Sequence, residues 1–189
     1  TIIKVNGPIL KKVYFPREIL PLSVVTAGLV NFFISCVIVL LFCIMCDSEQ
    51  KRKDIYYMSK AIEEAKKAYE KGEVPVGAII VCNDRIISRA HNLTETLTDI
   101  TAHAEMQAIT SASNVLGGKY LTNCTVYVTV EPCVMCAGAI GWSQISRIVY
   151  GARDNKKGYH ILSPNAFHPK ATVVSGILEN ECSELMTSF

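Results

Sequence analysis

Two short stretches decide the fold of this chain: Thr101-Ala102-His103-Ala104-Glu105 and Glu131-Pro132-Cys133-Val134-Met135-Cys136. They contain one imidazole and two thiols, which are side chains that bind zinc, and a catalytic zinc keeps its fourth position for water. A glutamate two residues after the histidine is placed to move protons on that water. The sequence therefore predicts a zinc site whose ligands are His103, Cys133 and Cys136, with Glu105 as the catalytic residue.

The Cys-x-x-Cys spacing alone leaves a second interpretation open. A strand followed by this motif at a helix start is also typical of thioredoxin-like redox dithiols. Positive charge at a helix N-terminus favours thiolates in either case. The histidine and glutamate on a second helix start favour zinc. The other histidines, at His91, His160 and His168, are isolated in the sequence and are expected at the surface or in packing contacts.

The apolar pattern around the two stretches predicts an α/β fold, with helices packed on a sheet. Helices are expected at 55–69, at 102–113 with His103 and Glu105 in its first turn, from Pro132 to 143, and at 178–186. Strands are expected at 76–81, 86–90, 125–130, 147–150 and 171–174, the first two joined by a turn at Asn83-Asp84.

The N-terminal part of the chain has a different composition. No residue from Ile19 to Cys46 is charged, and about 20 apolar residues suffice to span a bilayer core. Basic residues flank this run on both sides, so they predict no orientation. We expect a candidate transmembrane segment at 1–46, from a fragment or a fusion, a polar junction at 47–53 and an enzyme domain at 54–189.

The enzyme domain lacks the net positive charge that is typical of nucleic-acid-binding domains. Residues 54–189 hold twelve basic and fourteen acidic residues, and only the segment 147–157 forms a local basic cluster.

Cys82, Cys124 and Cys182 are expected to be buried free thiols, which fits a reducing compartment. We therefore expect a cytoplasmic enzyme domain, anchored to a membrane if the apolar segment is native.

Longer stretches of residues 54–189 resemble bacterial tRNA-specific adenosine deaminases, within the cytidine and deoxycytidylate deaminase superfamily. His-x-Glu followed by Pro-Cys-x-x-Cys is the signature of these zinc enzymes. The resemblance implies a cytidine deaminase-like three-layer α/β/α fold with a central mixed five-stranded sheet, here preceded by the apolar helix. It is carried by the two site stretches and by Gly72–Ala78, His91-Asn92, Ala137-Gly138-Ala139, Gly151-Ala152-Arg153-Asp154 and Gly176-Ile177-Leu178.

The resemblance implies hydrolytic deamination of adenosine to inosine at the wobble position of tRNA anticodons, by a homodimer with one zinc per subunit. It places Asn92 and the backbone of Ala104 on the flipped base, although Asn92 taken alone is typical of a turn cap. Arg153 and Asp154 match an RNA-contacting segment, and the weaker RNA contacts expected are Lys156, Lys157 and His168.

Two alternatives stay open at this point. The same zinc chemistry serves deaminases of a free base or nucleoside, such as guanine or cytosine. The other alternative is a membrane-protein fragment joined to an inactive domain. Residues 14–22 and 28–32 resemble part of the permease subunit of bacterial polysaccharide-export transporters, a resemblance that carries no chemistry.

Overall fold

The computed structural model describes the backbone of residues 19–189 and the side chains from Gly28 onward. The part of the permease resemblance at residues 14–18 lies outside the described residues. The chain divides into two units, Thr1–Gln50 and Lys51–Phe189. We describe each unit by itself.

The described part of the first unit is helical and belongs to α3 (Ile19–Glu70), which continues into the second unit. Its large apolar side chains from Leu29 to Met45 are exposed. An 18-residue window of this helix has a mean hydropathy of 2.8 and none of it is buried, so its length and composition suffice to cross a membrane. Residues 47–53, expected as a junction, are helical, because they contain Lys, Arg, Glu and Gln but no glycine or proline.

The second unit is built on one mixed sheet of five strands in the order β2-β1-β3-β4-β5. The central strand β3 (Cys124–Val130) pairs antiparallel with β1 (Gly77–Cys82) and parallel with β4 (Arg147–Ala152). Strand β2 (Arg85–His91) is the hairpin partner of β1, and β5 (Thr172–Ser175) lies parallel to β4. Asn83 and Asp84 both have positive φ, as expected for a tight hairpin turn.

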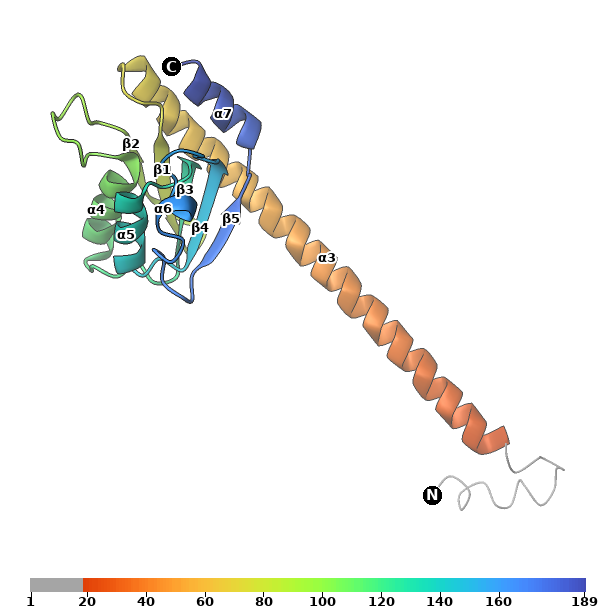
Figure 1. Cartoon of the computed structure of the whole chain (residues 1–189). Helices are drawn as coiled ribbons and strands as arrows, with labels where there is room; N and C mark the ends of the chain where they lie inside the picture. Colours follow the sequence, from red (N-terminus) through yellow and green to blue (C-terminus); the bar gives the residue numbers. More distant parts are fainter. Residues whose placement is uncertain (1–18) are drawn as a thin grey trace, which may run out of the picture. The chain divides into compact units, whose positions relative to one another are not determined.

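Helices cover both faces of this sheet (Figure 1). Helices α4 (Ala104–Leu116), α5 (Val134–Trp142) and the short α6 (Tyr159–Leu162) pack on one face, in a core that includes Ala78 and Ile80. Residues of α3 from Tyr57 onward and α7 (Glu179–Thr187) cover the other face, in a core that includes Ile79 and Val81. Strand β1 is apolar on both faces because its alternate residues enter the two cores. The three-layer α/β/α prediction is confirmed.

Several expected boundaries differ from the structure. Helix α4 begins at Ala104 rather than 102, so His103 is the N-cap with an extended backbone, not a first-turn residue. Helix α5 begins at Val134 rather than at Pro132, because Cys133 is held extended by a β-bridge to Gly158. Helix α6 has only four residues, too few to show an apolar period, and was not predicted.

The expectation for the three thiols outside the ligand motif was correct only in part. Cys82 and Cys124 lie directly opposite each other in the β1–β3 pair, so they are neighbours in space. Both are free cysteines, and Cys82 is half-buried rather than buried. Cys182 is buried, as expected.

One buried ion pair ties α3 to the sheet. The Arg147 guanidinium donates from Nη1 and Nη2 to the two carboxylate oxygens of Asp54, each at 2.7 Å. The Tyr127 hydroxyl donates to the same carboxylate at 2.9 Å. A bidentate pair of this kind is short and geometrically specific. It connects the helix with two neighbouring strands.

We predict that Asp54→Asn lowers the free energy of unfolding of the full chain by about 2–4 kcal/mol, because it leaves a half-buried guanidinium without its charge partner. Chemical denaturation measures this loss. The matched control is Asp84→Asn, which removes an exposed ion pair with Lys53 and is expected to cost less than about 1 kcal/mol. Equal losses in the two variants would contradict the assignment.

Candidate active site

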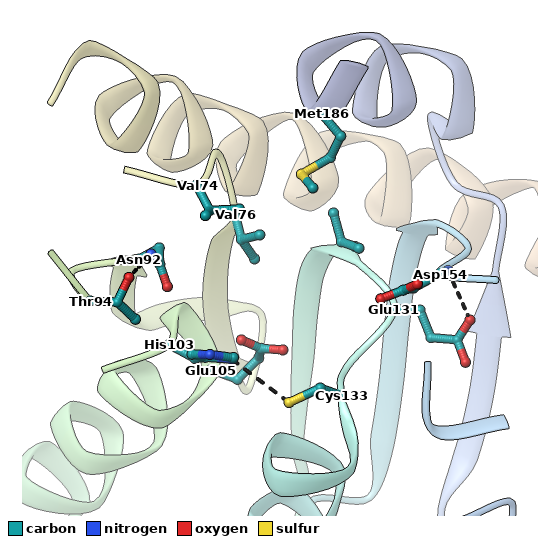
Figure 2. A pocket seen from close by; sticks show the side chains of 11 residues that line it. Val74, Val76, Asn92, Thr94, His103, Glu105, Glu131, Cys133, Asp154 and Met186 are labelled. Carbon is teal, nitrogen blue, oxygen red and sulfur yellow. Dashed lines mark hydrogen bonds between the residues drawn. The ribbon is translucent and has the colours of Figure 1, made fainter. Parts of the chain in front are cut away.

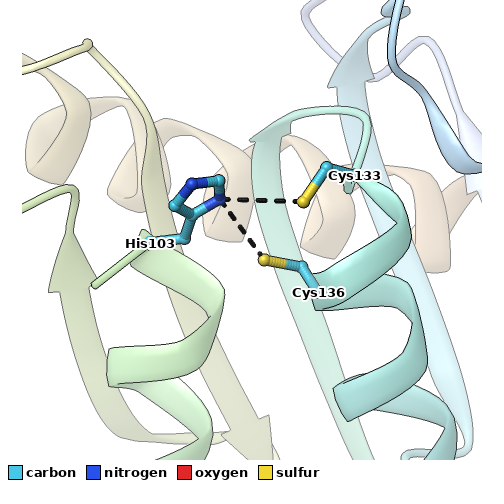
Figure 3. Close-up of side chains that lie close together, drawn as sticks. All are labelled: His103, Cys133 and Cys136. Atoms are coloured by element: carbon cyan, nitrogen blue, oxygen red, sulfur yellow. Dashed lines mark hydrogen bonds between the residues drawn. The ribbon is translucent and has the colours of Figure 1, made fainter. Parts of the chain in front are cut away.

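The starts of helices α4 and α5 bring the three predicted ligands together (Figure 3). His103 is the N-cap of α4, Cys133 is the N-cap of α5, and Cys136 follows in the first turn of α5. The Nδ1 atom of His103 lies 3.7 Å from the Cys133 sulfur and 3.5 Å from the Cys136 sulfur. All three ligand atoms lie within 4.8 Å of one another.

These separations fit a zinc ion. Zn–N bonds of about 2.0–2.1 Å and Zn–S bonds of about 2.3 Å, at tetrahedral angles, separate nitrogen and sulfur by roughly 3.6 Å. The two measured nitrogen–sulfur distances, 3.5 and 3.7 Å, lie on either side of that value. One imidazole and two thiols also form a donor set suited to a catalytic zinc. In the described part of the chain, this is the one such group of metal-binding side chains.

The two neighbouring thiols differ in pKa. A hydrogen bond from the Cys136 thiol, with support from His103, lowers the pKa of Cys133 to about 4, so Cys133 is a thiolate at neutral pH. The same hydrogen bond and burial raise the pKa of Cys136. A bound cation would favour the thiolate form of both residues, since metal binding requires both thiols to be deprotonated.

Glu105 lies beside this cluster on a cavity of about 200 Å³. Its side chain is buried in the first turn of α4, and burial raises its pKa above the ordinary glutamate value. A carboxyl group with a raised pKa is suited to taking up and returning a proton near neutral pH. Figure 2 shows Glu105 and His103 on one side of the cavity, with Cys133 facing them.

The other predicted site residues fall into two groups. Asn92, which is buried, and Asp154, which is half-buried, line the cavity. Ala104 is buried at the start of α4, where a backbone N–H has no acceptor within the helix. The described residues that line the cavity do not include the other predicted RNA contacts, which are all exposed: Arg153, Lys156, Lys157 and His168.

Sequence reasoning missed two buried carboxylates at the rim, Glu73 and Glu131. The oxygens of Glu131 accept hydrogen bonds from the backbone N–H of Asp154 at 3.2 Å and of His160 at 3.1 Å. A Cβ at Gly158 would lie 2.6 Å from the Glu131 carboxyl carbon, so only glycine fits there. For Glu131 the signal in the sequence was an acidic residue between a strand and an apolar stretch, whereas Glu73 follows the polar run Glu70-Lys71 and gave no such signal.

Comparisons with known proteins place these features in context. A family model for the zinc-binding region of cytidine and deoxycytidylate deaminases matches residues 51–152. The chain is 49% identical over 142 residues to the tRNA-specific adenosine deaminase of Bacillus subtilis (strain 168), covering 72% of this chain and 88% of that protein.

Two solved structures are also similar. One comes from a study of A-to-I editing by tRNA:A34 deaminases at the wobble position of transfer RNA. It has a TM-score of 0.65 and 41% identity, and the match covers 69% of this chain and 98% of that one. The other, a guanine deaminase from Bacillus subtilis, has a TM-score of 0.50 and 38% identity, with 52% of this chain and 63% of that one covered.

We predict that Cys136→Ser weakens zinc binding by more than about 100-fold, because loss of a partner outside the ligand set already costs 10–100-fold. Competition with a chromophoric chelator measures the affinity. Cys82→Ser is the matched control, since this thiol lies in β1, outside the ligand cluster. Wild-type zinc affinity in Cys136→Ser would show that the cluster is not the metal site.

Proposed function

Because this chain belongs to the cytidine and deoxycytidylate deaminase family, we propose that it converts adenosine to inosine at the wobble position of tRNA anticodons. The observation that carries the proposal is the cluster of His103, Cys133 and Cys136 beside the buried Glu105. The chain is 40–49% identical to tRNA-specific adenosine deaminases of several bacteria, and this similarity supports adenosine in tRNA as the substrate.

His103, Cys133 and Cys136 would hold one zinc per subunit, which supplies a water whose pKa is lowered toward about 7. Glu105 would take one proton from that water as the water oxygen attacks the amino-bearing ring carbon. Glu105 would deliver this proton to the ring nitrogen, then take the second proton from the same oxygen and deliver it to the departing amino group. Adenosine and water become inosine and ammonia, and the carboxylate returns to its starting state.

The proposed substrate contacts are supported by where the predicted residues lie. Asn92 and the backbone of Ala104 are assigned to the flipped base, supported by the place of Asn92 on the cavity and of Ala104 beside His103. Asp154 is assigned to the nucleotide near the cavity mouth. The exposed cations suit phosphate contacts, as weaker partners of the RNA together with His168: Arg153, Lys156 and Lys157.

The enzyme is proposed to act as a homodimer. Helices α5 and α6, which contact each other, leave large apolar side chains in solvent. Trp142, at the end of α5, is 86% exposed, and Val134, Ile161 and Leu162 are also exposed. Apolar side chains gathered on neighbouring elements often mark an interface. Sedimentation of the purified protein tests this assignment.

A free-base deaminase is the second candidate, because a guanine deaminase is among the similar structures. The deciding experiment compares inosine formation on an anticodon stem-loop that carries adenosine at the wobble position with ammonia release from guanine, cytosine and adenosine. We expect inosine in the stem-loop. Activity restricted to free bases would overturn the tRNA assignment.

We predict that Glu105→Ala lowers kcat on the stem-loop by at least about 1,000-fold, since it removes the group that moves protons. Zinc content should stay at the wild-type value, because Glu105 is not a ligand. Both quantities are measured on the same preparation. A variant that loses its metal but keeps residual turnover would show that Glu105 has a different role.

The enzyme domain is proposed to work in the cytoplasm. A membrane contact through residues 19–46 is a separate proposal, supported by the apolar, exposed side chains from Leu29 to Met45. The resemblance to a permease fragment stays a prediction. A chain beginning at Asp47 should keep kcat/KM within about twofold of the full chain, because the family model matches residues 51–152, which the shorter chain retains. Vesicle flotation of both chains measures the contact. Loss of activity in the shorter chain would tie the apolar segment to catalysis.

A further inference from the structure

Glu73 is a fully buried carboxylate just before strand β1, and its partners lie on the loop that follows β2. Its Oε2 accepts hydrogen bonds from Asn92 Nδ2 at 3.1 Å, from the Thr94 hydroxyl at 3.3 Å and from the Glu95 backbone N–H at 3.1 Å. Its Oε1 accepts from the Thr96 backbone N–H at 2.7 Å. One carboxylate thus connects the turn after α3 with the whole segment 92–96.

Glu73 is ionised at neutral pH. Burial disfavours its charge, but hydrogen bonds from Thr96, Glu95 and Thr94 outweigh this and lower its pKa to about 2. An ionised carboxylate is an acceptor only. Hydrogen bonds to it are shorter and stronger than those between neutral groups. The four donors around Glu73 are therefore held firmly.

This acceptor decides the orientation of Asn92. A carboxamide has a donor end and an acceptor end of nearly equal size, and only the donor end can face an ionised carboxylate. Asn92 Nδ2 donates to Glu73 and also to the Thr94 hydroxyl at 2.8 Å. Both amide hydrogens are used at the wall of the site. Figure 2 shows the carbonyl oxygen of Asn92 directed away from Thr94.

We propose that Glu73 is a positioning residue for substrate binding, which fixes the carboxamide orientation of Asn92 and anchors the rim segment 94–96. Glu73 does not itself line the cavity, whereas Asn92 and Thr94 do. Glu73 therefore acts on the substrate through its neighbours and determines which hydrogen-bonding groups the site offers to the base. This inference rests on the proposed function and deepens it.

A double-mutant cycle tests the proposal. Glu73→Gln keeps the size of the side chain but replaces one of its two acceptor oxygens by an NH₂ group. Because donors surround both oxygens of Glu73, the glutamine faces a donor in either orientation and competes for the carboxamide orientation of Asn92. We expect kcat/KM on the stem-loop to fall by about 10-fold or more, chiefly through KM, with normal zinc content. In an Asn92→Ala background the same change should cost less than about threefold, because coupled residues are not additive. Fully additive losses would overturn the proposal.

Asp54→Asn controls for the general destabilisation that follows when a buried carboxylate is neutralised. Asp54 forms an ion pair with Arg147 and accepts a hydrogen bond from the Tyr127 hydroxyl, and neither partner lines the cavity. This variant should lower the melting temperature while leaving KM within about twofold of wild type. If Asp54→Asn raises KM as much as Glu73→Gln, general destabilisation explains both effects and the positioning role is wrong.

A second measurement needs no turnover. In protein labelled with ¹⁵N at asparagine, the Asn92 side-chain NH₂ should exchange with solvent at least about 10-fold more slowly than exposed asparagine amides, and Glu73→Gln should abolish this protection. Unprotected Asn92 amides in the wild type would overturn the proposal. If the wild type fails to form inosine, the proposed function is wrong, while this measurement still decides the role of Glu73.

Discussion

The structure depends on one geometric constraint: three ligand atoms from two separate helix starts must lie close enough to bind a single ion. Strand β3 leads into Cys133, and the loop after β2 leads into His103. Both ligand residues are N-caps with extended backbones, so their side chains project from the helix ends rather than along the helix faces. The pairing of β1 with both β2 and β3 fixes the distance between these two exits. The strand pairing of the sheet thus sets the separation of the two helix starts that carry the candidate zinc ligands.

Two buried glutamates, Glu105 and Glu131, line the cavity, and a third, Glu73, contacts the lining residues Asn92 and Thr94. Their neighbours give each a different property. Glu105 has a raised pKa because burial dominates, which suits a residue that exchanges protons. Glu73 has a lowered pKa because backbone and side-chain donors surround it, which suits a permanent acceptor. Glu131 accepts backbone hydrogen bonds from the segment 154–160. Glu73 and Glu131 accept backbone hydrogen bonds from two different loops, whereas the raised pKa of Glu105 suits proton transfer.

The sequence predicted the parts of the site that rest on residue type and spacing. The clustering of His103, Cys133 and Cys136, the hairpin turn at Asn83-Asp84 and helices packed on a sheet follow from such patterns. The mixed five-stranded sheet was implied by the family resemblance instead. The start of α4 was misplaced because His103 interrupts neither the apolar pattern nor the helix propensity. The role of Glu73 was missed because its partners include backbone N–H groups more than 20 residues away, which no pattern of side chains encodes. The continuation of α3 through 47–53 follows from helix propensity, which the polar composition concealed.

The most direct test of the account is a reaction of the full chain with the anticodon stem-loop in H₂¹⁸O, followed by mass spectrometry of the nucleosides. Hydrolysis by a bound water predicts inosine that carries one ¹⁸O atom at the ring carbon that lost its amino group, with one ammonia released for each inosine. Unlabelled inosine would contradict attack by water. Complete recovery of adenosine by the zinc-loaded protein would contradict the assignment of this site to adenosine in RNA.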